Sequence, residues 1–242
     1  MVRRATTGAW MGRPRHYSAE VPLRCQELID LFGPAVEADS DPDGRWGGPL
    51  KTTFLVAMAT PMIVLPIERM FKQARARHEG VADDRELDPE LAAMVIDDLG
   101  PAQTFGAAPF FEPDVWAYVP TLDPFDVAND WPARALDELH SAVAAQAAAD
   151  APAQDILLAL RNALGHGGIT YLDENGRHTK AATNMLGFAS FARPRRPELR
   201  LLRVGVPGFE SFLRGWSKWL SSTGVLKQLE ERGPGHFDYA AE

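Results

Sequence analysis

The sequence contains a single cysteine, Cys25, and this scarcity excludes two common ways of holding a fold together. One thiol forms no intramolecular disulfide and has no cysteine partners for a structural zinc site. Low cysteine usage favours a reducing compartment. We therefore expect a cytoplasmic protein in which Cys25 is a core thiol.

Several motifs that carry chemistry are also missing. There is no glycine-rich phosphate loop ending in Gly-Lys-Ser/Thr, no Gly-x-Ser-x-Gly turn and no His-Glu-x-x-His. The six histidines are scattered, and no two stand four residues apart on a predicted helix. We expect neither a metal ion nor a cofactor.

Long apolar runs are absent as well. The most apolar stretch, residues 54–67, has 14 residues and is interrupted by Thr60, Pro61 and Pro66, whereas a membrane-spanning helix needs about 20. It fits a buried helix, and we expect no membrane association. Residues 1–17 carry four arginines and no acid but lack the apolar run of a signal peptide, so we expect a flexible basic arm.

The remaining composition is that of an ordinary globular protein, with 45 % hydrophobic and 24 % charged residues. Neither an internal repeat nor a Gly/Ser linker divides the chain, so residues 18–242 are predicted to form one domain. The net charge is −8, yet the segment 175–203 is strongly basic and has Glu198 as its only acid. Five of its residues are candidate RNA-binding groups, the alternative being a solvated face: Arg177, Lys180, Arg193, Arg195 and Arg196.

Hydrophobic periodicity predicts a mainly α protein, a helical bundle with a small added β-hairpin or sheet. Helices are expected over about 23–32, 53–77 (kinked or split by its prolines), 89–99, 132–149, 152–166 and 207–232. Strands are expected at 169–172 and 177–180, as a hairpin around the turn 173–176, and at 185–191 and 199–206. The aromatic segment 100–132 is interpreted as an irregular covering loop, with base stacking as the alternative.

One stretch, Arg161-Asn162-Ala163-Leu164-Gly165-His166, ends the predicted helix 152–166. On a helical wheel Asn162 and His166 lie about 40° apart, whereas Arg161 and His166 lie about 140° apart. Either the helix unwinds at Gly165, or the Arg and the His converge across two copies of the chain. Ala159 and Ala163 border the His166 face, where small side chains would let a second copy approach.

An Arg followed four to six residues later by a His is weak evidence by itself, since roughly 1.5 matches are expected by chance. Arg134 and His140 also fit the spacing, but only Arg161 is followed by an amide. The run LLALRNALGHGGITYLDENG resembles the catalytic helix and following segment of HEPN-domain proteins. These are helical bundles, often homodimers, and many are metal-independent endoribonucleases that act as toxins or in defence.

The resemblance implies that Arg161, Asn162 and His166 are catalytic. The expected partners are RNA, a second copy that completes the site, and an antitoxin or regulatory protein. The chemistry is consistent with this role. Histidine serves as acid or base near neutral pH, two copies supply one of each, and the arginine fork binds phosphate. Attack by the RNA 2′-hydroxyl would yield a 2′,3′-cyclic phosphate without a metal.

Two other interpretations stay open. One is purely structural: Arg161 pairs with an acid, Asn162 is a surface amide and His166 caps the helix. The other is a non-catalytic HEPN-like module that binds RNA or protein. Glu68, on the predicted second helix, would steady a site arginine or be an ordinary surface residue.

Overall fold

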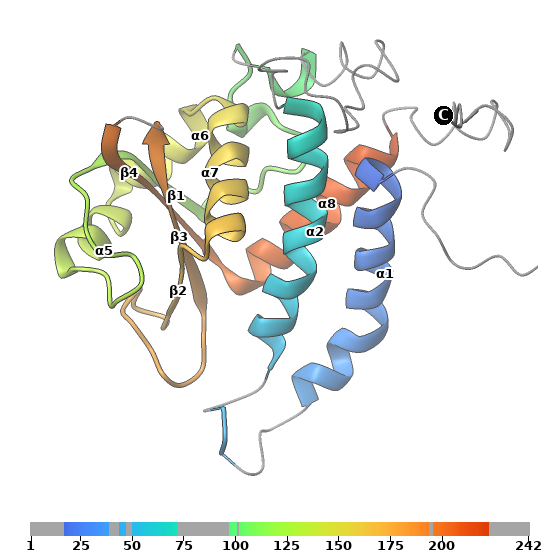
Figure 1. The fold of residues 1–242 in the computed structure, drawn as a ribbon, viewed down its shortest axis with the longest axis horizontal. Coiled ribbons are helices and arrows are strands. Elements are labelled where there is room, and N and C mark those ends of the chain that lie inside the picture. Colours follow the sequence, from blue (N-terminus) through green and yellow to red (C-terminus); the bar gives the residue numbers. More distant parts are fainter. Residues whose placement is uncertain are drawn as a thin grey trace, which may run out of the picture.

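The protein is mainly α-helical, with a small antiparallel sheet of four strands (Figure 1). The computed structural model describes residues 17–38, 44–46, 50–71, 97–100, 102–193 and 196–222. Its elements are α1 (Tyr17–Ala38), α2 (Lys51–Phe71), the 3-10 helix η1 (Phe105–Ala107), β1 (Trp116–Leu122), α5 (Ala133–Leu139), α6 (Ala142–Asp150), α7 (Ala153–His166), β2 (Ile169–Leu172), β3 (Met185–Arg193), β4 (Arg196–Gly205) and α8 (Val206–Ser222).

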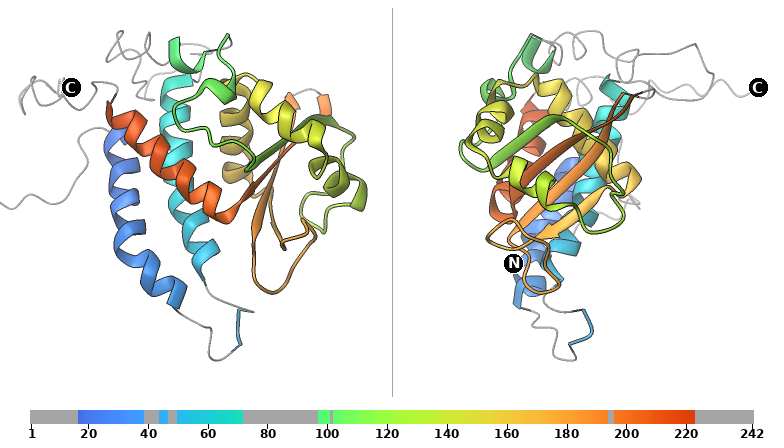
Figure 2. Two further views of the ribbon diagram at one scale, coloured as in Figure 1. Left: turned by 180° about the vertical axis from the view of Figure 1, so that it is seen from behind. Right: turned by 90° about the vertical axis from the view of Figure 1, so that its left-hand side faces the viewer.

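The strands lie in the order β1-β4-β3-β2, and each neighbouring pair is antiparallel. Alternate side chains enter two cores. Trp116 and Tyr118 join the larger core with α1, α2, α7 and α8, whereas Ala117 and Val119 face a smaller core beneath α5. The two views of Figure 2 show the four long helices on one side of the sheet and α5 on the other. The sheet therefore has a hydrophobic core on each face, and only some of its side chains, such as Tyr171 and Phe191, are exposed.

The covering role predicted for residues 100–132 is confirmed, but the segment is not wholly irregular, because it contains β1. Phe105 and Trp116 pack edge to face with ring centroids 5.2 Å apart, and Phe110 does the same with Trp216 at 5.3 Å. All four rings are at most 5 % exposed, so none of them is available for base stacking. This strand was not predicted because its first four residues are all buried, which removes the alternating pattern of a strand. It also contains Pro120, a residue that strands accept mainly at the edge of a sheet, where β1 lies.

The first helix is longer than the predicted 23–32, and the second is not split by its prolines. α1 continues past Gly33 and Pro34 to Ala38, and α2 is one helix despite Pro61 and Pro66. Packing of the two helices against each other and against α8 outweighs the lost hydrogen bonds. The predicted extension of the second helix to Arg77, the helix 89–99 before Asp97 and the tail after Ser222 lie outside the described residues, as do residues 1–16 of the predicted arm.

By length and composition alone, one described segment, Lys51–Glu68 of α2, would suffice to cross a membrane. A third of this window is buried, and only Thr53 and Ala57 in it are exposed. Leu55, Met62 and Ile63 belong to the larger core. These core contacts agree with the buried helix expected from the sequence, whereas the expectation that the segment is too short to cross a membrane is not upheld.

Two further predictions were wrong in detail. The single helix expected over 132–149 is divided into α5 and α6, because Ser141 caps α6 by accepting a hydrogen bond from the Ala144 N–H at 3.1 Å. The strand expected at 177–180 is not a regular strand. On the open edge of β2 the backbone of these residues makes one isolated bridge, from His178 to Leu172, and the strand that pairs along β2 is β3. The turn itself is present, with Gly176 at φ 69°.

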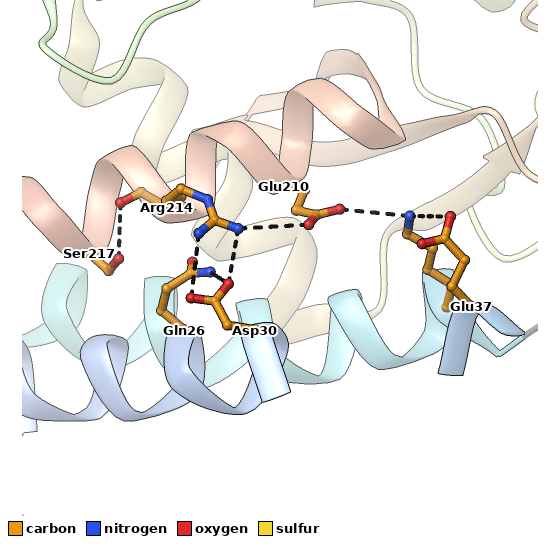
Figure 3. A network of polar contacts seen from close by, with 7 residues as sticks. Gln26, Asp30, Glu37, Glu210, Arg214 and Ser217 are labelled. Carbon is orange, nitrogen blue, oxygen red and sulfur yellow. Dashed lines mark hydrogen bonds and ion pairs between the residues drawn. The ribbon is translucent and has the colours of Figure 1, made fainter. Parts of the chain in front are cut away.

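A chain of alternating charges joins α1, α2 and α8 (Figure 3). Arg214 lies 2.9 Å from Asp30 and 3.9 Å from Glu210, and Lys51 lies 2.9 Å from Glu37 and 3.8 Å from Glu210. Each acidic side chain in this network thus forms an ion pair with a basic side chain of another helix, and Glu210 also lies close to Arg214 one turn further along α8.

Candidate functional site

Helix α7 carries the predicted site residues and packs into the larger core through one apolar stripe. The stripe consists of Ile156, Leu157, Leu160 and Leu164, which are all buried. The helix ends at Gly167, whose φ of 76° is the left-handed conformation that favours glycine. Its hydrogen bonding is continuous through Gly165 to His166. The first alternative, a helix that unwinds at Gly165, is therefore wrong.

Arg161 is held by two neighbours on the side of α7 that faces α2. Its Nη2 forms an ion pair with Glu68 Oε1, and its Nη1 donates a hydrogen bond to Asn162 Oδ1 at 2.5 Å. The side chains of Arg161 and Glu68 are 25 % and 24 % exposed. Burial lowers the pKa of the Arg161 guanidinium below its ordinary value. Glu68 therefore forms an ion pair with Arg161, and both the catalytic and the purely structural interpretation of Arg161 predict such a pair.

His166 is exposed and stands apart from this pair. It occupies the last turn of α7, and within the described part of the chain no hydrogen bond or ion pair joins it to Arg161 or Asn162. Because the helix is unbroken, the wheel angle of about 140° between Arg161 and His166 is retained. One protomer thus brings Arg161, Asn162 and Glu68 together and leaves His166 separate.

The small residues expected to admit a second copy are buried within the same chain. Ala159 is 3 % exposed and Ala163 is fully buried, and both belong to the larger core. The close approach they permit is that of the chain's own elements, since α7 packs against α2 and β3. This prediction was wrong, because a wheel shows which residues share a face but not which face the fold covers.

The described RNA-binding candidates belong to different parts of the fold. Arg177 lies 2.7 Å from Asp137 of α5, which places it at the opposite face of the sheet. Lys180 is exposed. Arg193 and Arg196 are backbone neighbours where β3 meets β4, while Arg195 lies outside the described residues.

Two other cations of the basic segment are engaged within the protein. Arg200 lies 3.5 Å from Asp155. Arg203 Nη1 donates to His140 Nδ1 at 2.7 Å, and burial lowers the pKa of its guanidinium. Because arginine is always a donor, His140 accepts through Nδ1. Part of the basic segment therefore serves packing rather than forming one open face.

No group of three or more His, Cys, Asp or Glu side chains is placed to hold a metal ion within the ranges that the structure describes. Comparison with protein-family models, with curated proteins and with solved structures finds no match to this chain.

Proposed function

We propose that this protein is a metal-independent endoribonuclease of the HEPN type, acting as a toxin or defence effector in the cytoplasm. The observation that carries the proposal is the environment of Arg161. Its guanidinium is oriented by Glu68 and Asn162 while a quarter of the side chain stays exposed, and the same helix ends in an exposed His166. This arrangement supports the proposal together with the resemblance of the LLALRNALGHGG run to the HEPN motif.

The proposed reaction divides the work between two kinds of group. Of the five N–H donors of Arg161, two are used by Glu68 and Asn162, which leaves donors for a phosphate and for the charge that develops on it. A His166 imidazole takes the proton of the RNA 2′-hydroxyl as its oxygen attacks phosphorus. A second, protonated His166 gives a proton to the departing 5′-oxygen. The products are a 2′,3′-cyclic phosphate and a 5′-hydroxyl.

Two imidazoles in one site require two protomers, because each chain has only one His166. The proposed active form is therefore a homodimer with the site at its interface. In a fully exchanged equal mixture of parent and His166→Ala protomers, random pairing leaves about one quarter of the parental activity, because heterodimers lack one imidazole. About one half would mean that the two histidines work in separate sites.

The decisive experiment is RNA cleavage in excess chelator, with 2′,3′-cyclic ends detected on the products. His166→Ala should abolish cleavage and keep the fold. The matched control is His140→Ala, which removes the histidine of the other Arg–His spacing and should remain active. Intact RNA after incubation with a well-folded parental dimer would contradict the proposal.

A second candidate is a non-catalytic HEPN-like module that holds RNA or a regulatory protein. The ion pair favours it, because Glu68 offsets the charge that Arg161 would present to a phosphate. This module predicts RNA binding without cleavage, and binding that His166→Ala leaves unchanged.

A further inference from the structure

A cleft of about 620 Å³ opens where β2, the loop 179–184 and the start of α2 meet. Its lining includes Trp46, Lys51, Tyr171, Thr179, Lys180 and Asn184. None of these side chains takes part in the proposed reaction. The chemistry of the lining therefore has to be explained separately.

Two exposed aromatic rings stand at this cleft. Trp46 is 62 % exposed and Tyr171 is 37 % exposed, whereas the other tryptophans among the described residues are at most 6 % exposed. The guanidinium of Arg45 lies 4.7 Å from the centroid of the Trp46 ring and adds positive charge there. Exposed rings beside cations are the surfaces on which unpaired bases stack.

The charge of the cleft is opposite to that of the protein. The chain carries a net charge of −8, yet the lining has two lysines, Lys51 and Lys180, and one carboxylate, Glu37. That carboxylate is paired with Lys51 at 2.9 Å. Lys180 on the exposed loop is left to attract an anion, and threonine and asparagine side chains beside it offer hydrogen bonds. The lining suits a ligand with flat rings and phosphates.

The cleft also begins close to His166. Tyr171 follows His166 by five residues, a chain length that spans at most about 18 Å. Ile169 and Tyr171 share one face of β2, and Ile169 packs on the larger core beside α7. A short single strand of RNA is long enough to reach from the aromatic rings to the helix end.

We propose that this cleft binds single-stranded RNA, with bases stacked on Tyr171 and Trp46 and a phosphate held by Lys180. The inference rests on the proposed function, since it assigns that enzyme its substrate-holding surface. It differs from the set of RNA-binding candidates identified in the sequence, because Lys180 is the one described member of that set that lines the cleft.

The test measures binding of a labelled ten-nucleotide RNA to full-length His166→Ala protein, in which the RNA survives. Tyr171→Ala and Lys180→Ala should each weaken binding by about fivefold to tenfold, the range expected for loss of one stacked base or one phosphate contact. Matched controls are Phe191→Ala, an aromatic residue that is 59 % exposed on β3, and Lys218→Ala, an exposed lysine on α8. Both controls should bind as the parent does.

Acrylamide quenching supplies a second readout in a Trp10→Phe background, where Trp46 is the exposed indole of the described chain. Single-stranded RNA should protect this fluorescence, whereas duplex RNA and a free mononucleotide should protect it much less. Unchanged binding in both cleft variants, equal protection by duplex RNA, or no RNA binding by the parent would overturn the inference. Cleft-dependent binding without cleavage by the wild type would sustain it and refute the ribonuclease proposal instead.

Discussion

Replacing Glu68 by glutamine tests how the Arg161 side chain is held. The substitution keeps the size of the side chain and removes its charge. Both partners are about a quarter exposed, so the pair lies between surface ion pairs, which are worth about 0–1 kcal/mol, and buried ones, whose disruption costs about 3–5 kcal/mol. Since the amide oxygen still accepts a hydrogen bond, we expect Glu68→Gln to lower the free energy of unfolding by about 1–2 kcal/mol.

The assay is urea unfolding, with Asp137→Asn as the matched control. Asp137 pairs with Arg177 at 2.7 Å, but the two side chains are 60 % and 52 % exposed. Solvent screening should keep the effect of Asp137→Asn at or below about 0.5 kcal/mol. Equal effects of the two substitutions would refute the reasoning, because burial would then not distinguish the pairs.

Catalysis gives the same variant a second, independent readout. With an amide in place of the carboxylate, the Arg161 fork is held less firmly in its orientation, so kcat should fall by about tenfold. Removing a negative charge should also strengthen attraction to RNA, so KM should fall as well. A merely structural role for Glu68 would lower the amount of folded enzyme without this division between kcat and KM.

Three further outcomes follow from packing and burial. A Cβ on Gly168 would lie 2.2 Å from the Ala189 carbonyl oxygen, whereas a Cβ on Gly165 would have no neighbouring atom within 4 Å. Gly168→Ala should therefore lower the free energy of unfolding by several kcal/mol, and Gly165→Ala should raise it by about 0.5–1 kcal/mol. Ala163→Leu should lower stability by about 1–3 kcal/mol, and full stability would show that Ala163 is not enclosed. Burial raises the pKa of the Cys25 thiol. The stability that the protonated thiol contributes is therefore complete below the ordinary thiol pKa and is lost as pH rises through the pKa of the folded state. Between about pH 8 and 10 the urea midpoint of the parent protein should fall more steeply than that of Cys25→Ala.

The parts of the fold that follow from local periodicity were predictable. The helices α7 and α8 were predicted correctly because apolar residues such as Leu160 and Trp216, which are fully buried, recur at helical spacing. The strands β3 and β4 were also expected, and the structure extends both by a few residues. In these segments the residue pattern and the tertiary environment agree.

The parts that depend on contacts between distant segments were not predictable. The pairing of β2 with β3, which leaves residues 177–180 with a single bridge at the edge of the sheet, depends on contacts between distant segments. The ion pair between Arg161 and Glu68 depends on how α2 packs along α7, which one sequence does not specify. For the same reason Ala163 was assigned to a partner's surface although the chain's own elements cover it.

The unbroken helix α7 determines what a second copy would have to contact. Arg161 is fixed toward α2, and Gly165, His166 and Gly167 form the exposed end of α7. A partner that completes the proposed site must therefore approach this end, where Gly165 presents no side chain. Gly165→Gln should keep the protomer folded, because glutamine suits a helix and no atom would obstruct its Cβ. Its longer side chain should block the approach and abolish dimer and cleavage together, as measured by sedimentation and RNA cleavage. A Gly165→Gln variant that is still dimeric and active would place the interface elsewhere.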